Sequence, residues 1–285
     1  MSLLQKTIRA DVQATNAYVV APSAGMLKLD AMENPQGMPA ALLDELAQKL
    51  KEAELNRYPA PKALELEAAL RACTAIPKAA HVLFGNGSDE LIDLIIRACC
   101  MPGDAVLSPV PTFVMYAVYS QWSHARFVGV DLNADFSLNM PATLKAIATN
   151  KPKVVFLAYP NNPTGALYSD DLLKGIVAIA REHGLVIFAD EVYDKVLYDG
   201  AKHTAIGSLS EDVLTLTFNS LSKSYRSCGY RAGWMVVSGD KKPAKDYIEG
   251  LNMLSNMRLC ANVPGQWAIQ TALGGYQSIN DLVCE

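Results

Sequence analysis

Residues 185–193 read LVIFADEVY, which is a run of five apolar residues followed by Asp190, Glu191, Val192 and Tyr193. A short apolar run of this kind predicts a strand that is buried on both faces, as in a parallel sheet. A carboxylate directly after such a strand is typical of the sheet edge where ligands bind. The stretch therefore predicts an α/β protein with a functional edge.

The same pattern recurs along the rest of the chain. Further strand-like runs occur at residues 81–84, 105–107, 125–130, 154–158, 213–218 and 233–237. Helical stretches separate most of them, at 39–55, 64–73, 89–99, 112–122, 140–149, 169–183 and 264–273. Alternating strands and helices predict a three-layer α/β sandwich, in which helices cover both faces of a mainly parallel central sheet.

Composition narrows the class of protein. The 285 residues are 51% hydrophobic and carry a formal net charge of −4, so the chain can bury a large core. No basic block suggests a nucleic-acid partner, and no apolar stretch has the length of about 18 residues that a membrane span needs. The cysteines lack C-x-x-C spacing, so we expect no structural metal. We expect a soluble, cytoplasmic protein.

Polar residues gather where four of the predicted strands end. They lie at residues 87–89, 161–165, 190–193 and 220–223. Open α/β sheets bind their ligands beyond the carboxyl ends of the strands. We therefore expect these groups to share one site.

Lys223 is the most unusual of these residues. It follows a predicted strand, with Ser220 and Ser222 beside it and Arg231 eight positions later. Two hydroxyls, an amine and a guanidinium suit a phosphate site next to a nucleophilic amine. Lysine forms Schiff bases once its amine is partly neutral, and burial or a nearby cation lowers its pKa. The alternative is a surface lysine on a polar loop, and this segment favours neither interpretation.

Asp190 ends an apolar strand, and a buried carboxylate is costly unless it is paired. A pyridinium nitrogen against Asp190 would explain the burial, and Tyr193 could donate its hydroxyl to an oxygen of the same ring. The alternative is an aspartate that caps the following turn through local backbone bonds. Taken alone, Asp190 favours the cap.

Three further groups are ambiguous one by one. Asn162 precedes a Pro-Thr-Gly turn that could aim its amide at a phenolate oxygen, but an ordinary turn is an equal alternative. Residues 85–89, GNGSD, place small residues at a helix N-terminus, which suits a phosphate. Phe113 could stack on a flat ring, although an aromatic there is more often part of the core.

The order of these residues along the chain favours one interpretation. The motifs are N-N-P-T-G at 161–165, A-D-E-V-Y at 189–193, S-L-S-K at 220–223 and G-Y-R-A-G at 229–233. On these motifs the chain resembles the fold-type I, pyridoxal-phosphate-dependent aminotransferases of the class I and II group. The resemblance implies pyridoxal 5'-phosphate as the cofactor and the large-domain fold of that group.

The resemblance also implies a role for each residue. Lys223 would hold the cofactor covalently and move the proton at the substrate Cα. Asp190 would pair with the ring nitrogen, while Asn162 and Tyr193 would bind the ring oxygen. Phe113 would stack on the ring. The residues that would surround the phosphate group are Gly87, Ser88, Asp89, Ser220, Ser222 and Arg231.

Two halves of the chain resemble different aminotransferases. The chain resembles histidinol-phosphate aminotransferase at residues 28–35, 56–59 and 85–90. It resembles bacterial alanine aminotransferase at residues 188–195, 233–236 and 257–264. The first half lines the substrate entrance in that family, so we expect transamination of histidinol phosphate with 2-oxoglutarate or glutamate, a step of histidine biosynthesis. The alternatives are an alanine/pyruvate–glutamate aminotransferase, a carbon–sulfur lyase on the same fold, and an inactive cofactor-binding fragment.

The resemblance implies a homodimer, because Tyr58 in N-R-Y-P looks like a tyrosine that relatives lend to the partner subunit's phosphate site. It divides the chain into an N-terminal arm (1–38), a large cofactor-binding domain (39–262) and the start of a small domain (263–285). Relatives continue into a small domain with an arginine for the substrate carboxylate, so we expect that domain to be largely missing. Arg226 and Arg258 are the candidates to replace that arginine. The apolar side chains that we expect to stay partly exposed are Tyr276, Ile279, Leu282 and Val283.

Overall fold

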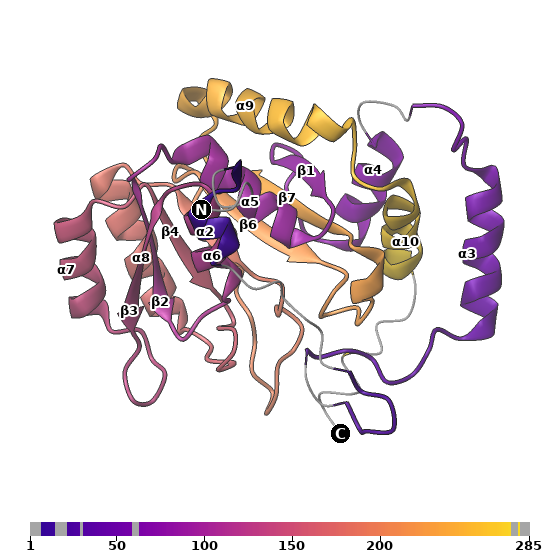
Figure 1. Ribbon diagram of the computed structural model, residues 1–285, viewed down its shortest axis with the longest axis horizontal. Coiled ribbons are helices and arrows are strands. Elements are labelled where there is room, and N and C mark those ends of the chain that lie inside the picture. The colour runs from indigo at the N-terminus through magenta and orange to yellow at the C-terminus, as the bar shows by residue number, and fades with distance from the viewer. Residues whose placement is uncertain (1–6, 15–21, 29–30, 59–62, 275–278, 280–285) are drawn as a thin grey trace.

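One sheet organises the protein. The computed structural model describes residues 7–14, 22–28, 31–58, 63–274 and 279. In this part of the chain seven strands form a sheet of order β1-β7-β6-β5-β4-β2-β3 (Figure 1). Their bounds are β1 His81–Gly85, β2 Ala105–Val110, β3 Arg126–Asp131, β4 Val154–Ala158, β5 Ile187–Asp190, β6 Thr215–Ser220 and β7 Gly233–Ser238. Each predicted strand is present, and the α/β prediction is confirmed.

The sheet is mainly parallel. β2 pairs in parallel with β3 and β4, β4 pairs with β5, and β5 pairs with β6. β7 runs the other way and pairs antiparallel with β1 and β6. Gly233, which begins β7, therefore lies opposite Gly85 and Ser220, which end β1 and β6. The amino end of β7 thus joins the carboxyl ends of the other strands at one edge.

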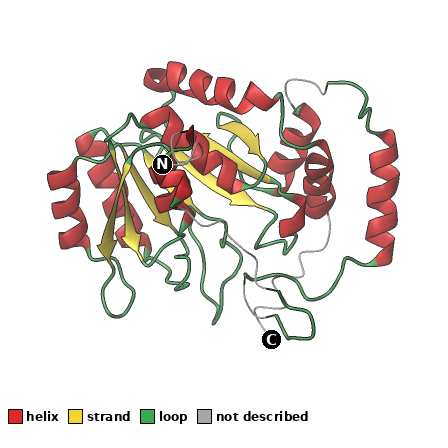
Figure 2. Cartoon of the chain, viewed as in Figure 1, coloured by secondary structure: helices red, strands yellow, loops and turns green. Residues whose placement is uncertain are grey.

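Helices cover both faces of the sheet (Figure 2). Buried side chains of α5, α6 and α9 pack on one face. On the other face α8 packs against β5, and α4 and α10 pack against β1 and β7. The helices are α2 Ala10–Gln13, α3 Ala40–Glu52, α4 Leu64–Cys73, α5 Ser88–Cys99, α6 Met115–Trp122, α7 Met140–Asn150, α8 Asp170–His183, α9 Lys245–Ser255 and α10 Val263–Gly274.

Burial on both faces explains why the strand sequences are continuous apolar runs. In β5, Phe188 belongs to the core cluster on one face, whereas Ile187 and Ala189 belong to the cluster on the other. Successive strand side chains point to opposite faces, so a strand covered on both sides needs apolar residues at every position. The polar residues are therefore displaced to the strand ends.

Local signals set the bounds of α8. The Ser169 hydroxyl accepts a hydrogen bond from the Leu172 N–H, and Gly184 ends the helix in the left-handed conformation. Leu173 and Val177 recur at helical spacing and are buried against the sheet. The prediction of a helix over 169–183 is confirmed.

Several helices differ from the sequence prediction. α2 was not predicted, and α3 ends at Glu52 rather than at residue 55. α6 begins at Met115 rather than at 112, because Thr112 accepts a hydrogen bond from Ser108 in the loop that leaves β2. α9 was not predicted. Its sequence nevertheless has helical periodicity, because Tyr247, Ile248 and Leu251 pack against the core from one side of the helix.

The expectation that Ile279 stays exposed was wrong. Its side chain is 4% exposed and lines a hollow between α3 and α10 with Leu46 and Ala268. Tyr276, Leu282 and Val283 lie outside the described residues. The domain boundary at 262 stays a prediction. No described helix is both long enough and apolar enough to cross a membrane.

Candidate active site

A cavity opens at the edge where the strand ends meet. Its lining comes from the segments that follow β1, β4, β5 and β6, together with residues from the β2–α6 loop and from the approach to β7. The lining residues are Ser88, Asp89, Phe113, Ala158, Pro160, Asn162, Asp190, Val192, Tyr193, Ser222, Lys223, Cys228 and Arg231. The structure thus brings most of the sequence-predicted site residues together.

Lys223 presents its amine to this cavity. The backbone N–H of Ser222 donates to the buried Ser220 hydroxyl over 3.2 Å, which orders the loop after β6. The Lys223 Nζ donates to the Ala31 carbonyl over 2.8 Å and lies 5.9 Å from the centre of the Tyr193 ring. Burial lowers the pKa of the amine, which favours its neutral, nucleophilic form.

Asp190 forms the buried floor of the site. Burial raises the pKa of its carboxyl to about 6. The Tyr116 hydroxyl opposes this effect, since it donates a 2.6 Å hydrogen bond to Oδ2 of Asp190. The Tyr116 ring is fully buried and stacks on Phe156 at 4.6 Å. No cationic side chain among the described residues forms a salt bridge with Asp190, so an incoming cation would be stabilised there.

Two polar side chains and one aromatic ring line the middle of the cavity. Burial, and then the charge of Asp190, raise the pKa of Tyr193 to about 12, so its hydroxyl is a donor at neutral pH. Asn161 accepts hydrogen bonds from the Thr164 N–H and hydroxyl, whereas its neighbour Asn162 lines the cavity. Phe113 also lines it.

Arg231 meets the first turn of α5 at the other end. Its Nη2 donates to Asp89 Oδ2 over 2.7 Å. A Cβ added at Gly87, whose φ is +84°, would lie 2.6 Å from that nitrogen. A Cβ at Gly233 would lie 2.7 Å from Gly87 and from the Ser88 nitrogen. The close approach of these backbones places a guanidinium beside a helix N-terminus, an arrangement that binds anions.

Some predicted residues lie off the cavity wall. Gly87 and Ser220 are buried behind it, and Gly87 still bounds the space that Arg231 occupies. Tyr58 is 85% exposed and does not line the cavity of its own chain. Arg258 was a candidate to bind a substrate carboxylate, but its guanidinium pairs with Glu90 and hydrogen-bonds to it. That interaction engages the charge of Arg258 away from the cavity.

Several residues of the site were not predicted from the sequence. Tyr116 lies one helical turn after Phe113, and this i, i+3 spacing is the signal that could have placed both near one site. The Ala31 carbonyl and the Cys228 side chain carry no such signal. No group of His, Cys, Asp or Glu in the described ranges is arranged to hold a metal ion.

Glu191, next to Asp190, is also buried and lies outside the cavity. Burial raises the pKa of its carboxyl to about 8, and its Oε1 accepts from the Ile206 N–H over 3.0 Å. Its Oε2 lies 3.4 Å from Nε2 of His203, whose pKa burial lowers. At neutral pH the contact is therefore between a neutral carboxyl and a neutral imidazole.

Comparisons with known proteins agree with this geometry. The family described as aminotransferase class I and II matches residues 24–284. The glutamate-pyruvate aminotransferase AlaA of Haemophilus influenzae is 51% identical over 205 residues, which make up 71% of this chain and 50% of that protein. The histidinol-phosphate aminotransferase 2 of Bordetella parapertussis is 46% identical over 233 residues, which make up 82% of this chain and 62% of that protein.

A solved structure extends the likeness to the fold. The crystal structure of an aminotransferase from Escherichia coli is 41% identical, with a TM-score of 0.80 over 88% of this chain and 63% of that chain. The chain spans about half the length of the AlaA relatives that it matches.

We predict that Tyr116→Phe raises the pKa of Asp190 by about one pH unit, because a hydrogen bond to the ionised carboxylate is lost. Titration of the Asp190 carboxyl by ¹³C NMR in the cofactor-free protein measures this. Tyr119→Phe, on the same helix, is the matched control and should leave the pKa unchanged. Equal pKa values in all three proteins would show that the hydroxyl does not act on Asp190.

We predict that Glu191→Gln flattens the pH dependence of stability. Glu191 keeps its proton up to about pH 8 when folded but releases it near 4.5 when unfolded, so the free energy of unfolding falls as pH rises through that window. The slope from this group is up to about 1.4 kcal/mol per pH unit. Glutamine keeps the acceptor for Ile206 and can donate to His203.

Urea unfolding at pH values from 5 to about 8 provides the measurement, and the free energy of unfolding of the wild type should fall more steeply with pH than that of the mutant throughout this window. Glu182→Gln, which removes an exposed carboxylate from α8, is the control. Parallel curves for wild type and Glu191→Gln would mean that Glu191 is ionised in the folded protein.

Proposed function

The chain belongs to the class I and II aminotransferases, and from this membership we infer that its cavity binds pyridoxal 5'-phosphate and transfers an amino group between alanine and glutamate by way of their 2-oxo acids. Members of the class use this cofactor. The observation that carries the proposal is one cavity holding a desolvated lysine amine, a buried carboxylate and an anion site.

The residues present fit the cofactor. Asp190 is a buried carboxylate that would meet the positive charge of a pyridinium nitrogen. The anion site of Arg231 and the first turn of α5 suits a phosphate monoester, and the glycine at 87 leaves room for the Arg231 guanidinium. Lys223 lines the same cavity, and burial lowers the pKa of its amine.

Each residue then has a task in the reaction. Bound pyridoxal phosphate supplies an electron sink for the bonds at the substrate Cα. Asp190 keeps the ring nitrogen protonated, and that charge in turn lowers the pKa of Asp190 itself. Tyr193 and Asn162 would donate hydrogen bonds to the ring oxygen, and Phe113 would pack on the ring. Ser222 joins Arg231 in binding the phosphate.

Lys223 moves the proton. Its amine lines the cavity and would take up the proton that leaves the substrate Cα. A general base works best with a pKa near the operating pH, so burial of this amine favours the step.

Similarity to named relatives favours one amino donor over the other. Glutamate-pyruvate aminotransferases match at 50 to 51% identity, which favours alanine over the histidinol phosphate that the sequence first suggested. One observation still favours the second candidate: the histidinol-phosphate aminotransferase match spans 82% of this chain, against 71% for AlaA. Both candidates use the same cofactor chemistry.

Titration of the cofactor-loaded chain with amino donors tests the proposal. Alanine and glutamate should each remove the visible absorption band of the bound cofactor and yield pyruvate and 2-oxoglutarate. Asp190→Asn should bind cofactor but convert donors at least about 100-fold more slowly, since an amide cannot hold the ring nitrogen protonated.

Other products would contradict this substrate assignment. Conversion of histidinol phosphate with alanine left unchanged would favour the second candidate. Release of ammonia together with a 2-oxo acid, without any acceptor, would identify a lyase instead. Wild-type rates in Asp190→Asn would show that Asp190 is a turn cap.

We also propose that the protein acts as a homodimer in which Tyr58 serves the partner's site. Tyr58 is 85% exposed and does not line its own cavity, which supports a role across an interface. Its segment follows α3 rather than a strand of the sheet.

We predict that mixing Lys223→Ala chains with Tyr58→Ala chains restores activity. Neither variant has an intact site alone, but each mixed dimer would contain one. Random reassortment at equal amounts should restore about a quarter of the wild-type sites. No recovery from chains shown by mass to form mixed dimers would place Tyr58 outside the partner's site.

A further inference from the structure

Asn262 occupies the position directly before α10 and caps that helix. Its Oδ1 accepts a hydrogen bond of 2.6 Å from the Gly265 N–H. Asparagine is a favoured residue for this purpose, because its side chain satisfies an N–H that the helix leaves without a partner. The cap uses one half of the amide and leaves the NH₂ group for other contacts.

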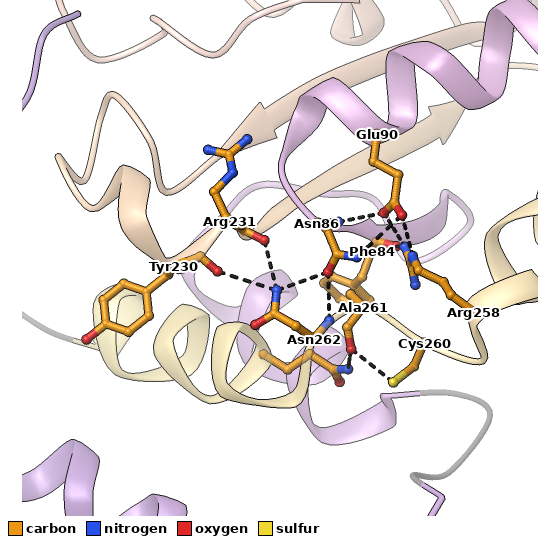
Figure 3. A network of polar contacts seen from close by, with 10 residues as sticks. Phe84, Asn86, Glu90, Tyr230, Arg231, Arg258, Cys260, Ala261 and Asn262 are labelled. Carbon is orange, nitrogen blue, oxygen red and sulfur yellow. Dashed lines mark hydrogen bonds and ion pairs between the residues drawn. The ribbon is translucent and has the colours of Figure 1, made fainter. Parts of the chain in front are cut away.

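The other half of the amide reaches two distant segments. Figure 3 shows Asn262 between Asn86, in the turn after β1, and the backbone of Tyr230 and Arg231. Its Nδ2 donates to the Arg231 carbonyl and to Asn86 Oδ1, each over 3.0 Å. Its backbone N–H donates to the same Asn86 oxygen over 2.8 Å. One residue thus connects α10 to the turn before α5 and to the segment of Arg231.

Glu90 holds the same turn from its other side. Its carboxylate accepts from the Asn86 N–H over 2.6 Å and pairs with the Arg258 guanidinium (Figure 3). Asn86 is therefore fixed at its backbone by Glu90 and at its side chain by Asn262. These contacts fix the position of the residues at which α5 begins.

The contact with Arg231 matters because the backbone of Arg231 is strained. Its φ and ψ are 47° and 54°, a left-handed conformation that costs free energy in a residue other than glycine. From this conformation the guanidinium reaches Asp89 and lies against Gly87. A hydrogen bond to its carbonyl stabilises the backbone that aims the side chain.

We propose that Asn262 is a positioning residue for the phosphate group of the cofactor. Its amide holds the Arg231 backbone and the turn before α5 at a fixed separation, so the guanidinium and the helix N-terminus face the same anion. Because the bridge starts from the first turn of α10, docking of that helix also supports phosphate binding. This inference rests on the proposed function, since it assumes that the anion is the cofactor's phosphate.

Asn262→Ser separates this role from helix capping. Serine caps helices about as well as asparagine, so an acceptor for the Gly265 N–H is kept. The shorter side chain has no amide to bridge Arg231 and Asn86. Asn139→Ser is the matched control, because Asn139 caps α7 by accepting from the Ala142 N–H over 3.2 Å and does not line the cavity.

The experiment compares two ligands that differ by the phosphate group. Dissociation constants of pyridoxal phosphate and of pyridoxal are measured by absorbance titration of the full chain. Asn262→Ser should raise the dissociation constant of pyridoxal phosphate about tenfold and that of pyridoxal by less than about twofold. Asn139→Ser should leave the preference for the phosphorylated ligand unchanged. In an Arg231→Ala background, Asn262→Ser should weaken the binding of pyridoxal phosphate by less than about a further twofold, because both residues act on the phosphate group.

The outcomes separate the two proposals. Equal weakening of both ligands by Asn262→Ser would show that Asn262 only caps α10. A full tenfold effect in the Arg231→Ala background would show that Asn262 does not position the guanidinium. Either result would overturn the inference alone. A wild-type chain that binds pyridoxal phosphate no more tightly than pyridoxal would overturn the phosphate site, and with it both proposals.

Discussion

The burial of one carboxylate is the constraint on which the site depends. Asp190 ends a strand whose other residues are apolar because helices cover both faces of the sheet. The carboxyl is consequently partly buried in the wall of the cavity, and this burial raises its pKa to about 6. Tyr116 supplies one hydrogen bond but no charge. A cation over Asp190 would complete the arrangement, and a protonated heterocyclic nitrogen has the required chemistry.

The single reversed strand supplies the opposite end of the site. Because β7 runs antiparallel to β1 and β6, the residues before Gly233 arrive at the edge that the other strands leave. Gly87 and Gly233 let the two backbones approach, and Arg231 reaches the first turn of α5. The carboxylate of Asp190, which suits a cation, and the guanidinium of Arg231, which suits an anion, thus line one cavity together with the Lys223 amine.

The parts that the sequence could predict are those encoded locally. Continuous apolar runs predicted the strands. The position of Asp190, Asn162 and Lys223 just after such runs predicted that they belong to the site. Tyr116, Ala31 and Asn262 were not predictable as partners, because their hydrogen bonds span 74, 192 and 176 residues of chain. Such contacts depend on the order and direction of the strands. Strand order, and the reversal of β7 above all, has no signature in a periodicity of apolar residues.

Chemical trapping of the cofactor tests whether Lys223 is the residue that holds it. The chain is mixed with pyridoxal phosphate, reduced with borohydride, digested and mapped by mass spectrometry. We expect one dominant pyridoxyl label on the Lys223 side chain, since among the described residues this is the lysine amine that lines the cavity, and burial lowers its pKa. A label spread over surface lysines, or concentrated on another residue such as Lys195, would contradict it.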